Sequence, residues 1–162
     1  MTWPEGRKTV DYLIERNRLE KLLADTAEPG FEAIFERAEA RMITARGALG
    51  VPDSTGAYAV AYDAYRMAGE SLLARQALRA TGGEGSQMTV EDAVAAQFAA
   101  SITAFAKPTF EQFRRKRHTA QYFDIDAPPI TQADAEWAVA TAEAALDGVR
   151  MLIGSNPPDL FE

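Results

Sequence analysis

Apolar side chains recur every three or four residues along almost the whole chain, and strict alternation of apolar and polar residues is scarce. This spacing follows the α-helical turn and not the two-residue period of a strand. Of the 162 residues, 31 are alanine, the residue with the highest helix propensity. The sequence therefore predicts an all-α fold, an antiparallel bundle of about six helices. We expect these helices at residues 9–25, 31–49, 55–80, 89–106, 109–123 and 131–154.

Short breaker sequences separate the expected helices. Proline and glycine interrupt the pattern at 28–30, and a turn at 50–54 offers an N-cap candidate. The glycine-rich segment 81–86 is expected to be a mobile connection between helices. Capping boxes are expected at Thr89 and at Thr131. No linker is long enough to divide the chain, so we expect one domain over residues 1–162 with a frayed tail at 155–162.

The composition excludes several classes of chemistry. There is no cysteine, so disulfide scaffolds, thiolate metal sites and cysteine nucleophiles are excluded. His118 is the only histidine, which leaves no two-histidine pair within one chain. A Walker A motif, a Gly-Xaa-Ser-Xaa-Gly elbow and the Glu-Xaa-Xaa-His pairs of di-iron bundles are also absent from the sequence. We therefore expect no metal and no cofactor.

The net charge and the polar N-terminus bear on the partners and the cellular location of the chain. The net charge is −7, so the chain as a whole has no general affinity for nucleic acid. No apolar run follows the N-terminus, and none approaches the roughly 20 residues of a membrane span. We expect a cytoplasmic protein without membrane contact.

Positive charge is concentrated in residues 107–118. This segment has a net charge of +4, whereas the remaining residues together carry −11. Its basic residues are Lys107, Arg114, Arg115, Lys116 and Arg117, and its single acidic residue is Glu111. Any contact with a polyanion should therefore be local to this segment.

On a helix with about 100° per residue, Arg117 falls within the apolar stripe of this segment. Arg114, His118 and Tyr122 form an adjacent polar edge, and Arg115 borders it. Two explanations fit the position of Arg117. It pairs with a carboxylate of the bundle, or it lines a groove where a phosphate or a partner chain docks. His118 lies one turn before Tyr122, and a neutral imidazole there is able to act as a base.

Two further groups are expected to be structural. Tyr58, Tyr62 and Tyr65 form one helical stripe, which favours buried core residues with hydrogen-bonded hydroxyl groups over a base-stacking platform. The acidic clusters within 32–39 and 136–147 are expected on solvated helix faces.

The basic segment resembles the arginine motif of the HEPN superfamily of small α-helical domains. That motif is an arginine, a polar residue, three variable residues and a histidine, near the end of a late helix. Here Arg117 stands at the family arginine, His118 at the polar position and Tyr122 at the position of the family histidine. The resemblance extends over about residues 55–154, which would form the HEPN-like core, and residues 1–50 would add N-terminal helices. Its further segments are 62–64, 73–79, 90–94, 97–98 and 114–117.

The resemblance implies a helical bundle that commonly forms a homodimer, with two arginine motifs at a shared cleft. Many members of the family are metal-independent ribonucleases of toxin–antitoxin and phage-defence systems, in which the arginine holds phosphate and the histidine assists attack by the ribose 2′-hydroxyl. Other members bind RNA or nucleotides without catalysis, or are partners of nucleotidyltransferases. Tyr122 departs from the motif, because a phenol with a pKa near 10 is a poor base at neutral pH.

Three hypotheses follow. The first is a module that binds RNA or a nucleotide through Arg114, Arg115 and Arg117, as a non-catalytic or regulatory member of a toxin–antitoxin or phage-defence system. An antitoxin or a nucleotidyltransferase would then be its partner. The second is a metal-independent endoribonuclease with Arg117, His118 and Tyr122 as catalytic residues and His118 as the base. The third is a structural or protein-partner domain with Arg117 in an internal salt bridge.

Overall fold

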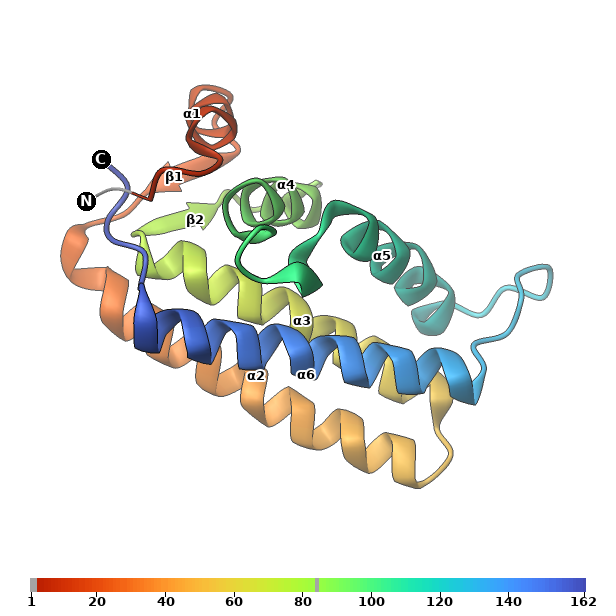
Figure 1. Ribbon diagram of the computed structural model, residues 1–162. Helices are drawn as coiled ribbons and strands as arrows, with labels where there is room; N and C mark the ends of the chain where they lie inside the picture. Colours follow the sequence, from red (N-terminus) through yellow and green to blue (C-terminus); the bar gives the residue numbers. More distant parts are fainter. Residues whose placement is uncertain (1–2, 84) are drawn as a thin grey trace.

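Three long helices lie side by side and contain most of the core: α2 (Ala27–Gly50), α3 (Ser54–Arg75) and α6 (Gln132–Ser155). Helix α3 packs against both of the others (Figure 1). The computed structural model describes residues 3–83 and 85–162. Glu84, in the glycine-rich connection that was expected to be mobile, lies outside the described residues.

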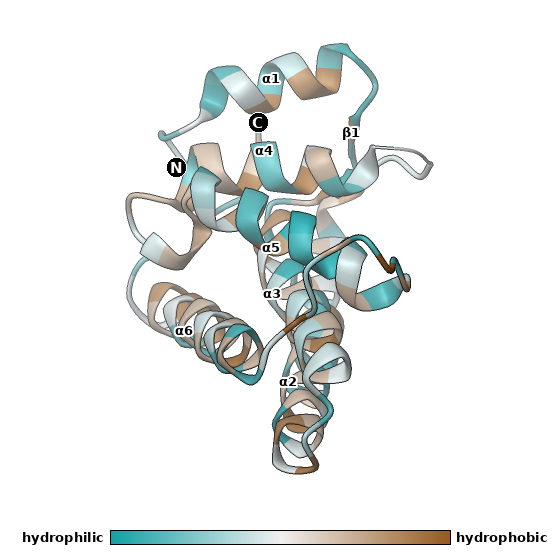
Figure 2. Cartoon of the chain, turned by 90° about the vertical axis from the view of Figure 1, so that its right-hand side faces the viewer, coloured by the Kyte–Doolittle hydropathy of each residue, from teal (hydrophilic) through white to brown (hydrophobic). Residues whose placement is uncertain are grey.

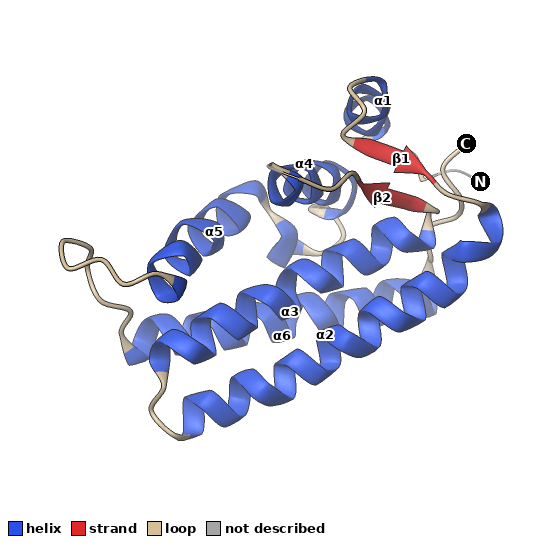
Figure 3. Ribbon diagram, turned by 180° about the vertical axis from the view of Figure 1, so that it is seen from behind, coloured by secondary structure: helices blue, strands red, loops and turns tan. Residues whose placement is uncertain are grey.

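The shorter elements cover the opposite side of α3 (Figure 3). Helices α4 and α5 pack on α3, and α1 packs on α4. A two-stranded antiparallel ribbon of β1 and β2 lies beside the end of α3. The bounds of these elements are α1 Arg7–Glu15, β1 Leu19–Lys21, β2 Leu78–Ala80, α4 Ser86–Phe98 and α5 Lys107–Gln121, with 3₁₀ turns at Ala24–Thr26 and Thr103–Phe105.

The predicted all-α fold is confirmed, with six α-helices in the described residues and in the expected order. The capping box at α6 is also confirmed, since Thr131 accepts from the Asp134 backbone and the Asp134 side chain accepts from the Thr131 backbone. None of the described helices combines the length and the apolar character that a bilayer span requires.

The first predicted helix was too long, because α1 ends at Glu15 and a strand follows. Asn17 adopts a left-handed backbone with φ 57°. The backbone N–H of Arg18 then donates to the carbonyl of Leu13, and that of Asn17 donates to the carbonyl of Ile14. This is a Schellman stop, which asparagine tolerates better than most residues.

The third predicted helix was also too long, because α3 ends at Arg75 and not at residue 80. Ala77 adopts φ 56°, which reverses the chain after the helix. Leu78 then pairs with Lys21 of β1. The non-local ribbon outweighs the strain of a left-handed alanine, and only tertiary structure supplies that compensation.

The fourth predicted helix was shifted. Helix α4 begins at Ser86 after the left-handed Gly85, so Thr89 lies inside the helix and does not cap it. The helix ends at Phe98, and a 3₁₀ turn over Thr103–Phe105 replaces its expected last turns.

A cluster of aromatic rings joins α5 to α3. The ring centroids of Phe113 and Tyr65 are 4.7 Å apart, and those of Phe113 and Tyr58 are 5.4 Å apart. Tyr58 and Tyr65 are fully buried, and Tyr62 is nearly so. Their hydroxyl groups donate hydrogen bonds to Gln112 O, Gln87 Oε1 and Ala104 O. The expectation of a structural tyrosine stripe is thus confirmed. Because the cluster covers the inner face of α5, only the outer faces of that helix can contact a ligand.

The C-terminal tail was expected to be frayed, but it packs against the rest of the chain. Phe161 is buried, and its backbone N–H donates to the carbonyl of Gln76 at 3.1 Å. The guanidinium of Arg7 lies over the Phe161 ring at 5.0 Å. The buried Phe161 ring and the hydrogen bond to Gln76 therefore hold a tail whose sequence shows no helical pattern.

Candidate functional site

Two neighbouring helices hold the flanks of α5. On one flank, Arg114 Nε donates to Glu91 Oε2 of α4 at 3.0 Å. On the other, Lys116 Nζ donates to Asp134 Oδ1 in the first turn of α6 at 2.7 Å. The inner face of α5 packs into the aromatic cluster. Contacts with α4, α6 and α3 therefore fix the orientation of α5.

Glu91 is the most deeply buried charged residue near α5, with 1% of its surface exposed. Its Oε1 lies 3.0 Å from Lys107 Nζ, while its Oε2 accepts from Arg114. Burial lowers the pKa of Lys107, but hydrogen bonds to Asp92 and Glu91 outweigh it and raise that pKa above its ordinary value. This buried carboxylate therefore holds two cations of the basic segment against α4.

Arg117 packs against α3, as its place in the apolar stripe predicts. Its Nη2 lies 3.3 Å from Asp63 Oδ1, and its guanidinium lies over the Tyr62 ring at 5.4 Å from the centroid. The Arg117 side chain is 22% exposed. Its Nε is buried and has no hydrogen-bond partner among the described residues. The single contact with Asp63 thus leaves part of the guanidinium's donor capacity unused.

A hollow of about 380 Å³ opens between α4 and α5. We call it the basic cleft, and it is lined by Gln87, Arg114, Arg115, Arg117 and His118. Figure 2 shows α5 as a largely hydrophilic helix on this side of the molecule. Four of the five residues predicted as ligand-binding or catalytic therefore share one surface.

A second hollow of about 340 Å³ adjoins the basic cleft and shares Gln87 and Arg114 with it. It lies at the N-terminus of α4, where Gly85 is the N-cap and the first turn has no acidic residue. The first backbone N–H groups of a helix lack partners within that helix, and its dipole favours an anion there. Helix α4 therefore adds to the positive potential of the cleft.

Tyr122 does not line the cleft. Helix α5 ends at Gln121, and the side chain of Tyr122 is exposed. Its ring instead lies beside that of His118, with 5.0 Å between the centroids. His118 therefore lines the cleft together with the arginines, whereas Tyr122 lies outside the cleft and contacts the His118 ring.

The charge of the basic segment is largely offset by carboxylates from other parts of the fold. Glu91 and Asp63 are 23 and 54 residues away in sequence from their arginine partners. Arg115 is the most exposed arginine of the basic segment, and among the described residues it pairs with Glu111 over a long 3.9 Å. The sequence missed Asp63 as a partner and Gln87 as a lining residue, because neither has a local signal.

Among the described residues, no group of three or more His, Asp or Glu side chains is arranged to hold a metal ion. Comparison with protein-family models, curated proteins and solved structures finds no significant match. The function of the cleft is therefore argued from its own residues.

Proposed function

We propose that the basic cleft binds a phosphate group of RNA or of a nucleotide. The observation that carries this proposal is the convergence of Arg114, Arg115 and Arg117 on one hollow beside the N-terminus of α4. A guanidinium fork suits phosphate oxygens, and a helix N-terminus adds backbone donors. The resemblance of residues 117–122 to the HEPN arginine motif supports the same role for Arg117.

Asp63 is a positioning residue in this proposal. It holds one nitrogen of Arg117 at 3.3 Å, while the Tyr62 ring lies against the guanidinium. An arginine held in this way loses less conformational entropy when a ligand arrives. Because the neighbouring cations are paired, binding is expected to be local. Three phosphate contacts to single-stranded RNA would give a slope of log K against log salt of about −2.

The test is a fluorescence anisotropy titration of a labelled oligoribonucleotide and of a labelled nucleotide at low salt. We expect Arg117→Ala to weaken binding about tenfold or more, the effect of one lost charge-assisted contact. The control is Arg150→Ala on α6, an arginine that pairs with Glu39 and Asp147 outside the cleft. A flat titration, or equal binding by both variants, would reject the proposal in favour of a structural Arg117–Asp63 pair.

A metal-independent endoribonuclease is the second candidate, favoured by the presence of His118 and Arg117 in the same cleft. His118 would take the proton of a ribose 2′-hydroxyl, whose oxygen would attack the adjacent phosphorus as the bond to the 5′-oxygen breaks. The leaving 5′-oxygen would take a proton from water, so the products would be a 2′,3′-cyclic phosphate and a 5′-hydroxyl. Cleavage should persist in EDTA and be lost in His118→Ala. A variant as fast as the wild type eliminates this mechanism.

We infer in addition that the cleft is completed by a second chain. The loop between α5 and α6 projects from the body of the molecule (Figure 1) and exposes two large apolar side chains next to the cleft-bearing helix. Phe123 is 93% exposed and Ile125 is 84% exposed. Exposed apolar neighbours of this kind are typical of partner contacts. A homodimer agrees with the HEPN resemblance, and an antitoxin or nucleotidyltransferase is the alternative partner in a paired defence system.

Light scattering coupled to gel filtration measures this directly. The wild type should elute with the mass of a dimer, and Phe123→Ser should shift it to the monomer. A monomeric wild type at micromolar concentration would reject the homodimer.

A further inference from the structure

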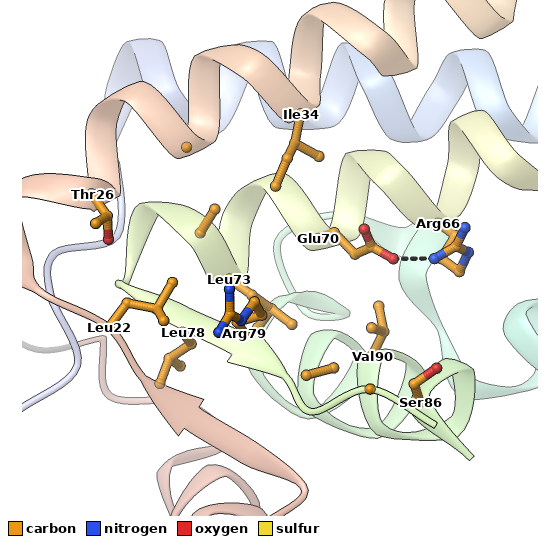
Figure 4. A pocket seen from close by; sticks show the side chains of 14 residues that line it. Leu22, Thr26, Ile34, Arg66, Glu70, Leu73, Leu78, Arg79, Ser86 and Val90 are labelled. Atoms are coloured by element: carbon orange, nitrogen blue, oxygen red, sulfur yellow. Dashed lines mark hydrogen bonds and ion pairs between the residues drawn. The ribbon is translucent and has the colours of Figure 1, made fainter. Parts of the chain in front are cut away.

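A cavity separate from the basic cleft lies between α2, α3, α4 and strand β2. Its volume is about 290 Å³. Leu73, Leu78 and Val90 form buried walls, and the half-buried Leu22 and Ile34 extend them towards solvent (Figure 4). No residue of the basic cleft lines it.

The size and lining of this cavity indicate an apolar ligand. Protein interiors pack closely, with few voids larger than a water molecule. An engineered apolar cavity of roughly 150 Å³ is large enough to bind benzene. This cavity has about twice that volume, so it has room for an apolar body of about eight to ten carbons. Exposed rim residues such as Thr26 and Gly82 provide a path from solvent.

One end of the cavity is polar. Arg66 and Glu70, one turn apart on α3, form an ion pair there, and Figure 4 shows the pair at the opposite end from Leu22 and Leu78. Arg66 Nε is buried and has no hydrogen-bond partner among the described residues. Burial raises the pKa of Glu70 above its ordinary value, although Arg66 lowers it. The polar end thus has the unpaired Nε donor of Arg66 beside the Glu70 carboxyl, whose pKa is raised.

The surrounding charges favour an anionic head group over a cationic one. Arg79, the other cation that lines the cavity, is held by Glu20 across the ribbon at 2.7 Å. Ser86, the first residue of α4, also lines the cavity, so the positive end of that helix dipole lies close by. An acceptor placed at Arg66 would satisfy its Nε, whereas an amine would leave it unsatisfied.

We propose that this cavity binds a small monocarboxylic acid with an apolar body of about eight to ten carbons, with its carboxylate on Arg66. The apolar body would lie between Ile34, Leu73 and Leu78. The ligand carboxylate would accept from Arg66 Nε, while Glu70 keeps its pair with Arg66 Nη1. This site does not depend on the function proposed for the basic cleft.

Isothermal titration of octanoate, octanol and octylamine into the wild-type chain tests the proposal. We expect octanoate to bind most tightly, and Arg66→Gln to weaken it about tenfold or more. Absence of octanoate binding would overturn the proposal. Tighter binding of octylamine would overturn it as well, because Glu70 would then be the group that holds the ligand.

A second pair of variants locates the ligand without touching the ion pair. Ile34→Trp fills the cavity from α2 and should abolish octanoate binding, whereas Ile43→Trp on the same helix is the control, because Ile43 is exposed and lies outside the cavity. Equal binding by both variants would place octanoate elsewhere. Arg117→Ala should leave octanoate binding unchanged, which separates this site from the basic cleft.

Discussion

Removal of the Glu91 charge tests how the basic segment is held. Glu91→Gln keeps the shape of the side chain but deprives Lys107 and Arg114 of their shared carboxylate, which is 3.0 Å from each. The carboxylate is almost fully buried, whereas Arg114 and Lys107 are 31% and 40% exposed at the side chain. We therefore expect the variant to lose stability and α5 to be less firmly attached to α4.

The magnitude follows from the burial of the three groups. Loss of one partner from a buried ion pair costs about 3–5 kcal/mol when the other charge stays buried. Here the two cations can recover part of their hydration, so we expect the lower end of that range, about 3 kcal/mol. For a domain of this size, 1 kcal/mol corresponds to roughly 2–4 °C in Tm, so Tm should fall by about 6–12 °C.

The assay is urea denaturation followed by circular dichroism. The matched control is Glu143→Gln, which removes an exposed carboxylate paired with Arg46 and should cost no more than about 1 kcal/mol. A loss below 1 kcal/mol in Glu91→Gln, or equal losses in both variants, would show that Glu91 does not hold the basic segment in place.

Two further predictions concern packing and pH. A Cβ at Gly148 would lie 2.6 Å from the Ile102 side chain, so Gly148→Ala should cost about 1–3 kcal/mol. Gly47→Ala, with open space around it, should instead stabilise α2 by about 0.5–1 kcal/mol. Equal Tm values for the two variants would contradict the close contact between Gly148 and Ile102. The hydrogen bond from Lys116 lowers the pKa of Asp134, so this carboxylate stabilises the fold above the ordinary aspartate pKa and loses that effect as the pH falls through its lowered value. The stability difference between wild type and Asp134→Asn should therefore be present at pH 7 and vanish in acid, and a difference independent of pH would contradict the pair.

The sequence predicts the helices well because their signals are local. Apolar spacing is visible within one element, and the capping box of Thr131 and Asp134 spans four residues. The ends of α1 and α3 were missed because they depend on left-handed Asn17 and Ala77. An alanine gives no sign of such a turn. The ribbon that stabilises it joins segments about sixty residues apart.

The sequence predicted most residues of the candidate site, but not the carboxylates that offset their positive charge. The helical wheel placed Arg117 in the apolar stripe, and the structure packs it against α3. The wheel contains no information about Asp63 or Glu91, which offset the positive charge from other helices. The cleft is consequently less positive than a count over residues 107–118 suggests. The buried tail at Phe161 was missed for the same reason, since Arg7 and Gln76, which it contacts, lie in distant parts of the chain.

The most direct test of the proposed phosphate site is a two-dimensional ¹H–¹⁵N NMR titration of the chain with adenosine monophosphate. We expect the shifting amides to cluster at the start of α4, near Gln87, and along α5 from Arg114 to His118, and the shifts to disappear in Arg117→Ala. Saturable shifts confined to other surfaces, or no shifts at millimolar nucleotide, would contradict a phosphate site in the basic cleft.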